Sequence, residues 1–220
     1  MAYRRTENVV RRLAARHDAI LAAAGALAAE SGISAVQIAP VAERAGIAAG
    51  TVYRYFPSKT DLVAALVASV SEREIGAMRQ AADAAPGPLS ALAAALTTFA
   101  AHALTERKLA FALIAEPVDA ATDKARLSYR AALAAEINAR LSAAVKAGYV
   151  PAQNIGATAP ALVGALAEGL VGPLAADPGD ETQMRDAVQT LTLFALRAVG
   201  VADARARGLV VQTAMPARPA

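Results

Sequence analysis

Residues 37–61 read QIAPVAERAGIAAGTVYRYFPSKTD, and this stretch decides how the chain folds. Ile38–Ala45 and Ala48–Phe56 are each long enough for a short helix. Gly46 lies between them, where a residue without a Cβ allows the chain to turn sharply. Two short helices joined by a glycine turn are typical of a helix-turn-helix unit, whose second helix enters the major groove of DNA. The stretch therefore predicts a nucleic-acid-binding unit.

The segments on either side complete a three-helix domain. Arg11–Glu30 carries one apolar stripe at helical spacing and ends before Gly32, a typical helix-ending residue. Pro57 ends the second short helix, and Ser58–Asp61 has the form of a capping box. That box begins a fourth helix, expected to run to about Ala82 and to lead out of the domain.

The second short helix is predicted to present a polar face to DNA. Val52 and Phe56 are expected to pack inward with the first helices, which leaves the other side chains facing outward. Hydroxyl groups, a cation and small residues suit close approach to phosphates and base edges. The outward set consists of Ala49, Gly50, Thr51, Tyr53, Arg54 and Tyr55.

The segment VAERAGIAAGTVYRYFPSKTDL resembles the DNA-binding signature of the TetR/AcrR family of transcriptional regulators, and the likeness extends over Arg11–Leu62. The resemblance implies a homodimer that binds a palindromic operator in double-stranded DNA as a repressor. It also implies that a small, mostly apolar effector, bound in the C-terminal domain, releases the DNA.

Carried over onto this sequence, the resemblance assigns DNA contacts residue by residue. Thr51 and Tyr53 match contacts to the DNA backbone, and Lys59 matches a lysine that pairs with a phosphate. Tyr55 matches a position that often touches DNA, and Gln37 stands where a threonine usually caps the second helix and touches phosphate. The positions of Ala49 and Gly50 match those that can reach bases.

Three residues depart from the family pattern. Ala48 stands where a serine usually caps the recognition helix, and losing such a cap typically costs about 1 kcal/mol. Pro40 replaces a polar residue, and Ala39 replaces a position where some members carry a base-reading arginine. We therefore expect sparse direct readout, with DNA shape taking a larger share of specificity.

The N-terminal quarter of the chain is basic. Residues 1–60 hold eight cations and four anions, whereas residues 61–220 hold 14 cations and 15 anions. Such asymmetry is typical of a surface that meets a polyanion, although a solvated helix face is the plain alternative. Arg4 and Arg5, with Arg11 and Arg12, fit either a disordered basic tail or an arm that reaches the minor groove.

The rest of the chain is expected to be helical. Hydrophobic residues make up 56% of the sequence but aromatic residues only 4%, which disfavours β sandwiches and barrels. The expected fold is all-α, with about nine helices: a three-helix helix-turn-helix domain followed by a helical regulatory and dimerisation domain. The expected boundaries are 1–60 for the DNA-binding domain, 61–205 for the second domain and 206–220 for a disordered tail.

Two sets of residues in the second domain are candidates for function. Apolar pockets cannot be separated from ordinary core by sequence, so either role is open for the six candidate effector contacts. These are Phe99, His102, Phe111, Ile114, Tyr129 and Leu133. In the resembling family the last two long helices pair across a twofold axis, which implies a dimer interface at Leu162, Leu166, Leu170, Leu191, Phe194 and Ala198.

Other classes of function find little support in the sequence. Cysteine is absent, and His17 and His102 lie far apart, so a structural role is favoured for both. Nucleophilic triads, metal-ligand clusters and glycine-rich phosphate loops are not evident, so we expect no enzyme, cofactor or metal. A membrane-surface module would oppose cations to large apolar residues, which these helices do not do. The uncharged stretches 84–105 and 147–167 are broken by proline and polar residues, so we expect a cytoplasmic protein with no membrane partner.

Overall fold

The computed structural model describes the backbone of residues 2–216 and the side chains of residues 8–216. Within that part of the chain every regular element is helical, which confirms the all-α prediction. In chain order the elements are α1 (Ala2–Ser31), the short 3₁₀ helix η1 (Ile33–Ala35), α2 (Ile38–Arg44), α3 (Ala49–Tyr55), α4 (Lys59–Asp83), α5 (Pro88–Thr105), α6 (Arg107–Ile114), α7 (Ala120–Lys146), α8 (Ile155–Val171), α9 (Glu181–Ala198) and α10 (Asp203–Gln212).

The nine expected helices are all present, and α10 is an additional one. It covers 206–212, for which the prediction of a disordered tail was wrong. The cause is burial: Ala206 and Val210 pack into the core, and α10 contacts α9 and α5. Asp203 at its start accepts from Arg207 at 2.9 Å and also binds Arg197 of α9. Residues 217–220 lie outside the described residues.

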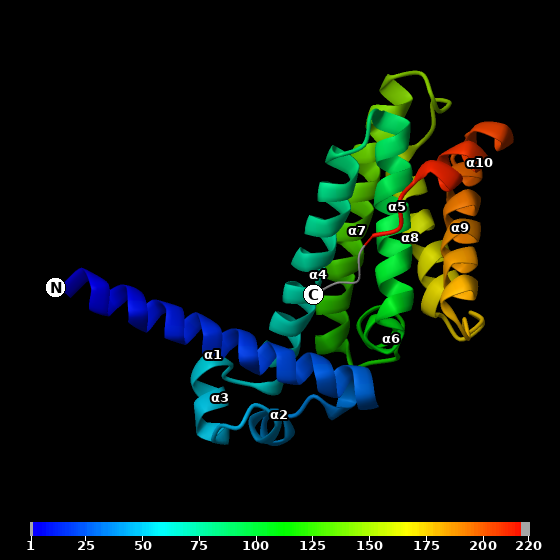
Figure 1. Cartoon of the computed structure of the whole chain (residues 1–220). Coiled ribbons are helices and arrows are strands. Elements are labelled where there is room, and N and C mark those ends of the chain that lie inside the picture. Colours follow the sequence, from blue (N-terminus) through cyan, green and yellow to red (C-terminus); the bar gives the residue numbers. More distant parts are fainter. Residues whose placement is uncertain (1, 217–220) are drawn as a thin grey trace.

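The DNA-binding head consists of α1, η1, α2 and α3. Ile20 and Ala24 of α1 pack with Val41, Val52 and Phe56 in a hydrophobic hub, as the sequence pattern predicts. Gly46 turns the chain between α2 and α3 with a φ of +65°, a conformation that favours glycine. In Figure 1 the head lies below the other helices, and the N-terminal half of α1 projects away from it.

Helices α4 to α10 form the body of the molecule. The long helix α4 leaves the head and packs along α5 and α7 (Figure 1). Its contact with α7 includes the buried carboxylate of Glu136, which accepts from Arg79 Nε at 2.8 Å and from Arg140 Nε at 2.7 Å. Arg140 also donates to Asp83 at 2.7 Å. These charged bonds join the C-terminal part of α4 to α7.

Helix α5 is the central helix of the body. Pro88–Thr105 is long and apolar enough to cross a membrane by length and composition alone, but 72% of it is buried inside the chain. It contacts α4, α7, α8 and α9. Its apolar character is therefore that of a core helix, surrounded on most sides by other helices.

Candidate nucleic-acid interface and effector cavity

Helix α3 exposes the face that the sequence predicted. Val52 is fully buried in the hub, whereas Tyr53 is 53% exposed, and Gly50 and Arg54 are also exposed. Thr51 is partly exposed. An added Cβ at Gly50 would meet no atom within 4 Å, and its φ is not positive, so neither packing nor backbone conformation within the chain requires glycine there. The open space in front of α3 suits close approach of another molecule.

Tyr55 and Ala49 have a packing role in this structure. Both are partly buried against the core cluster. The ring of Tyr55 lies 6.4 Å from that of His17, and His17 lies 5.2 Å from Phe56. His17 is thus part of an aromatic contact between α1 and α3, as favoured for an isolated histidine. A DNA contact by Tyr55 or Ala49 remains a prediction.

Helices α2, α3 and α4 differ in how their N-termini are capped. Ser58 caps α4, accepting from the backbone N–H of Asp61 at 3.1 Å, which confirms the N-cap half of the predicted capping box. The Ser58 hydroxyl in turn donates to Asp61 Oδ2 at 2.7 Å. Ala48 precedes α3 without a side-chain cap bond, as its residue type dictates. Gln37 precedes α2, but its side chain donates to the carbonyl of Ser34 at 2.9 Å and does not cap the helix.

The basic residues predicted to contact DNA include Lys59, Arg4 and Arg5. Lys59 is partly exposed at the start of α4, and no carboxylate lies within ion-pair distance among the described residues. It borders a cleft of about 350 Å³ together with Glu116 and Asp119. The backbone of Arg4 and Arg5 belongs to α1, but their side chains lie outside the described residues.

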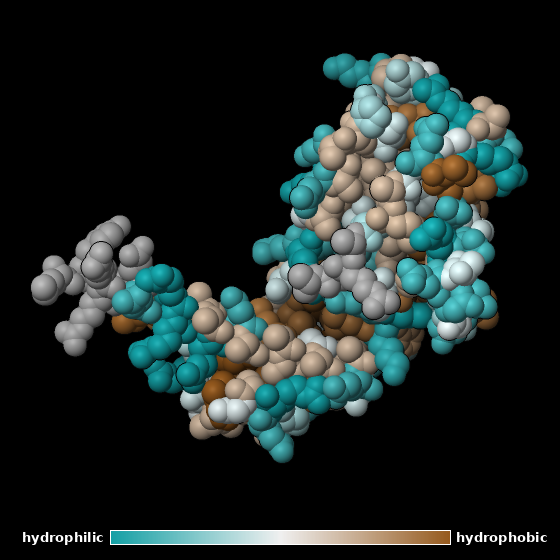
Figure 2. Space-filling view, in the orientation of Figure 1, coloured by the Kyte–Doolittle hydropathy of each residue, from teal (hydrophilic) through white to brown (hydrophobic). Residues whose placement is uncertain are grey.

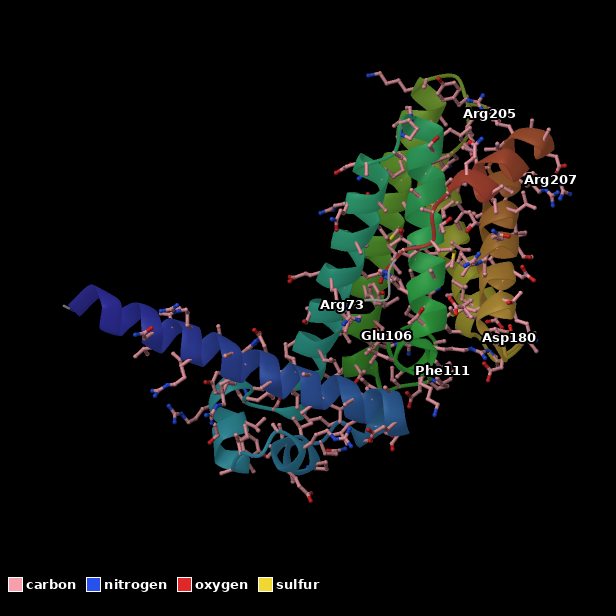
Figure 3. The ribbon with its side chains drawn as sticks, viewed as in Figure 1. Arg73, Glu106, Phe111, Asp180, Arg205 and Arg207 are labelled. Atoms are coloured by element: carbon pink, nitrogen blue, oxygen red, sulfur yellow. The ribbon has the colours of Figure 1, made fainter. Side chains whose placement is uncertain are left out.

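Four of the six effector candidates surround one small cavity in the body. Phe99 and His102 of α5, Ile114 of α6 and Tyr129 of α7 line a cavity of about 20 Å³. The other two candidates do not line this cavity, and an effector contact by any of the six remains a prediction. Leu133 is fully buried among the core helices. Phe111 lies on another side of α6, in a crevice beside the end of α1 (Figure 3).

The cavity also contains a carboxyl group that the sequence reading missed. Glu74 of α4 is 6% exposed, and its Oε2 lies 3.0 Å from His102 Nδ1. Its other oxygen, Oε1, is buried and has no hydrogen-bond partner among the described residues. Burial, with a smaller contribution from Glu74, raises the pKa of Tyr129 above its ordinary value and keeps its phenol neutral. The sequence feature that could have revealed Glu74 is its spacing, because it lies four residues from both Val70 and Met78 and so on the apolar side of α4.

A larger cleft adjoins the cavity. It has a volume of about 700 Å³ and lies between α1 of the head and α4 and α6 of the body. Val70, Arg73, Glu106 and Leu109 line both spaces. Arg73 donates to Glu106 at 2.5 Å, so this ion pair stands at the boundary between them (Figure 3). Figure 2 shows hydrophobic residues at the surface where α1 meets the body, at the hollow between them.

A chain of contacts links the cavity to the head. Arg126 of α7 is almost fully buried and donates to the backbone carbonyls of Ile114 and Glu116. The carboxylate of Glu116 then accepts from the backbone N–H of Ile33 at 2.9 Å. Ile114 lines the cavity and Ile33 belongs to the head. Helix α4 is therefore the covalent connection between the two parts but not the only physical one.

The expected dimer interface is corrected on α8. Three of the six candidates are buried within the chain itself, where a second copy cannot reach them: Leu162, Leu166 and Leu170. Their stripe faces the neighbouring helices of the same chain, chiefly α7. An apolar stripe predicts burial, and the sequence does not say whether the same chain or a partner provides it.

The three dimer-interface candidates on α9 are more exposed than those on α8. Leu191 is partly buried against Gly169 of α8, where an added Cβ would lie 2.8 Å from Leu191 Cδ2. Phe194 is 49% exposed and Ala198 is exposed. Of the expected interface, only Phe194 and Ala198 lie fully on the outer surface.

The fold and the exposed α3 define a two-part, all-helical protein with a helix-turn-helix head. The family described as "Bacterial regulatory proteins, tetR family" matches residues 20–66, which contain η1, α2 and α3 with their flanking helices. Residues 20–66 are thus similar to the DNA-binding domain of TetR-family transcriptional regulators, and the resemblance read from the sequence is confirmed.

Similar proteins agree with this assignment. The HTH-type transcriptional repressor KstR of Rhodococcus jostii (strain RHA1) is 52% identical over 58 residues, which are 26% of this chain and 27% of KstR. The chain thus matches about a quarter of that curated relative. Among solved structures, RolR in complex with resorcinol has a TM-score of 0.68 at 23% identity, covering 96% of this chain and 100% of RolR. FadR from Bacillus subtilis, in complex with stearoyl-CoA, has a TM-score of 0.67 at 18% identity, covering 79% of this chain and 96% of FadR. The fold of the whole chain is therefore that of these regulators.

Proposed function

We propose that this protein is a cytoplasmic, ligand-responsive transcriptional repressor that binds a palindromic operator as a homodimer. The observation that carries the proposal is the face of α3. Tyr53, Arg54 and Gly50 are exposed there without a role in packing, on a helix whose family match is to DNA-binding domains. Phenol, guanidinium and bare backbone are groups that approach phosphates and base edges.

The proposed contacts divide by role. Tyr53, Thr51 and Lys59 bind phosphates and set the position of the head on the duplex, which carries no sequence information. Gln37, Tyr55 and Arg54 add contacts at the edge of the same face. Ala49 and Gly50 lie at the start of α3 and approach base edges, where a small side chain suits a thymine methyl group.

A dimer is supported by the exposed apolar residues of α9. Two recognition helices must lie about 34–36 Å apart to enter successive major grooves on one side of DNA. A closed twofold interface supplies that spacing and uses the same patch on both copies. Phe194 and Ala198 on α9 are the residues of the expected set that a second copy can reach.

The effector is proposed to act on the contacts between body and head. The cleft between α1, α4 and α6 adjoins the inner cavity, so a molecule that occupies both touches the two parts at once. A ligand that binds more tightly when the head is in a position unsuited to DNA lowers the DNA affinity of the protein. Linkage makes this factor equal to the one by which DNA lowers the ligand affinity, typically about 1–3 kcal/mol in free energy. RolR and FadR were solved with resorcinol and stearoyl-CoA, which supports a small-molecule role for this fold.

Selection from a random double-stranded DNA library tests the proposal directly. The wild-type protein should enrich one palindromic sequence with two equal half-sites. Tyr53→Phe should weaken binding to that sequence, whereas Tyr149→Phe, at an exposed tyrosine beside Arg205 near the C-terminal end of α7, should not. Failure to enrich any sequence would overturn the proposal. Enrichment of a single half-site would contradict the proposal that the protein binds DNA as a dimer.

A further inference from the structure

The inner cavity combines an apolar wall with one unsatisfied polar atom. Its lining is mostly apolar, including Val70, Phe99, Leu113 and Ile114. Against this wall lies Glu74 Oε1, which is buried and lacks a hydrogen-bond partner in the described part of the chain. An unpaired buried carboxyl oxygen costs more free energy than an unpaired neutral group, so a partner for it is strongly favoured.

The protein's own nearby groups are already engaged elsewhere. His102 Nδ1 lies 3.0 Å from the other oxygen of Glu74. Arg73 is bound to Glu106 at 2.5 Å, at the boundary with the outer cleft. Glu74 lines the inner cavity, so a donor group that enters this cavity is close to the unpaired carboxyl oxygen.

The dimensions of the two spaces restrict that donor. The cavity of about 20 Å³ holds a single group the size of a water molecule. The adjoining cleft of about 700 Å³ is large enough for the body of a small organic molecule. A ligand that reaches Glu74 thus has a small polar end and a larger, mostly apolar remainder.

The count of donors separates a hydroxyl group from an amine. A hydroxyl has one O–H to donate, and Glu74 Oε1 is one acceptor. An ammonium group has three N–H donors, and the second carboxyl group at the cavity, that of Glu106, is already bound to Arg73, so some of these donors would stay unpaired. The cavity is therefore better matched to a hydroxyl group than to a charged amine.

We infer that the effector site takes an uncharged, largely apolar alcohol or phenol, whose hydroxyl group donates to Glu74 Oε1 in place of water. This inference rests on the proposed effector site and adds the chemical class of its ligand. Glu74 is the specificity residue of the site, and the Arg73–Glu106 pair borders the passage to it.

Calorimetry on the full-length protein without DNA tests the inference with matched probes. The probes are 4-butylphenol and 4-butylcyclohexanol, the methyl ether of each, and 4-butylbenzylamine. Wild-type protein should bind each hydroxyl compound about tenfold more tightly than its ether, because leaving a buried carboxyl oxygen without a hydrogen-bond partner costs about that factor.

Substitutions then assign the preference to Glu74. Glu74→Leu should remove the preference, and Glu74→Gln, which keeps the shape and a neutral acceptor, should reduce it. Glu72→Leu, at an exposed position on the same helix, should keep it in full. Thermal melts of all variants show whether each one folds. If Glu74→Leu does not fold, the comparison of hydroxyl compounds with ethers in the wild-type protein still tests the inference.

Three results with the wild-type protein would overturn the inference. They are equal binding of hydroxyl compounds and ethers by wild-type protein, absence of binding by every probe, and tighter binding of the amine than of both hydroxyl compounds. A retained preference in a folded Glu74→Leu variant would also overturn it. Operator binding is measured separately. If the wild-type protein binds operator DNA but shows no hydroxyl preference, only this inference is rejected. If it shows the hydroxyl preference but binds no operator DNA, only the proposed regulatory function is rejected.

Discussion

Glu116 and Ile33 are joined by a hydrogen bond across the boundary between the body and the DNA-binding head. The carboxylate oxygen Oε2 of Glu116 lies 2.9 Å from the backbone nitrogen of Ile33, 83 residues away in sequence. Gly32 makes the approach possible, because an added Cβ there would lie 2.8 Å from Glu116 Oε1. Its φ of 81° and ψ of 172° also fall in a region that is essentially reserved for glycine.

Glu116→Ala should loosen the head from the body. Removing the carboxylate leaves the N–H of Ile33 without its partner, at a cost of about 1–3 kcal/mol for a partly buried group. Amide hydrogen exchange at Ile33 should therefore become faster by about tenfold or more, while core amides of α5 keep their protection. Glu72→Ala serves as the control. Unchanged exchange at Ile33 would show that this bond does not hold the head.

Gly50→Ala should weaken DNA binding without harming the fold. The added methyl group meets no atom of the chain within 4 Å, and alanine favours helix over glycine by up to about 1 kcal/mol. The stability measured by urea unfolding should stay equal or rise, whereas operator affinity should fall by about tenfold because the methyl group points toward DNA. Gly76→Ala on α4 is equally open and should leave DNA affinity unchanged. If the Gly50→Ala variant binds the operator with wild-type affinity, DNA does not contact this face of α3.

Ala48→Ser should stabilise the head. The N-terminus of α3 has no side-chain cap, and a serine hydroxyl can accept from a free N–H of its first turn. We expect about 1 kcal/mol of added stability by urea unfolding. Ala68→Ser, at an exposed position in the interior of α4, should give no gain. A loss of stability in the Ala48 variant would mean that the geometry of this N-terminus does not admit a cap.

Phe194→Glu should shift the protein from dimer to monomer. The side chain is exposed in the single chain, so the change does not disturb the core, but it would bury an unpaired charge in an apolar interface. Sedimentation equilibrium at micromolar concentration should show a much weaker dimer. Leu127→Glu on α7, where the leucine is also exposed, is the matched control. A dimer of full strength would exclude the exposed face of α9 as the interface.

The local structure of the head could be predicted from sequence because each step depends on near neighbours. Gly46 marks the turn, Ser58 caps α4, and the spacing of Val52 and Phe56 identifies the buried side of α3. Helix α10 was missed because its burial depends on Ala206 and Val210 meeting distant helices, which no local pattern reveals.

The body was harder to predict for the same reason. Phe99, His102, Ile114 and Tyr129 were correctly grouped around one cavity, but Glu74 was missed because a single glutamate in a helix usually faces water. The leucines of α8 were assigned to a dimer interface from the family resemblance, and the sequence could not correct this because an apolar stripe looks the same whether its partner is the same chain or another. Such distinctions come from tertiary contacts.

The most direct test of the central claim is the salt dependence of operator binding, measured by fluorescence anisotropy with the DNA recovered by selection. Wild-type protein should lose affinity linearly on a plot of log K against log salt concentration. Lys59→Ala should reduce the slope by about one unit for each phosphate contact, and so by about two for a dimer. Lys146→Ala, at the far end of α7, should keep the wild-type slope. Equal slopes for wild type and Lys59→Ala would contradict the assignment of this surface to DNA.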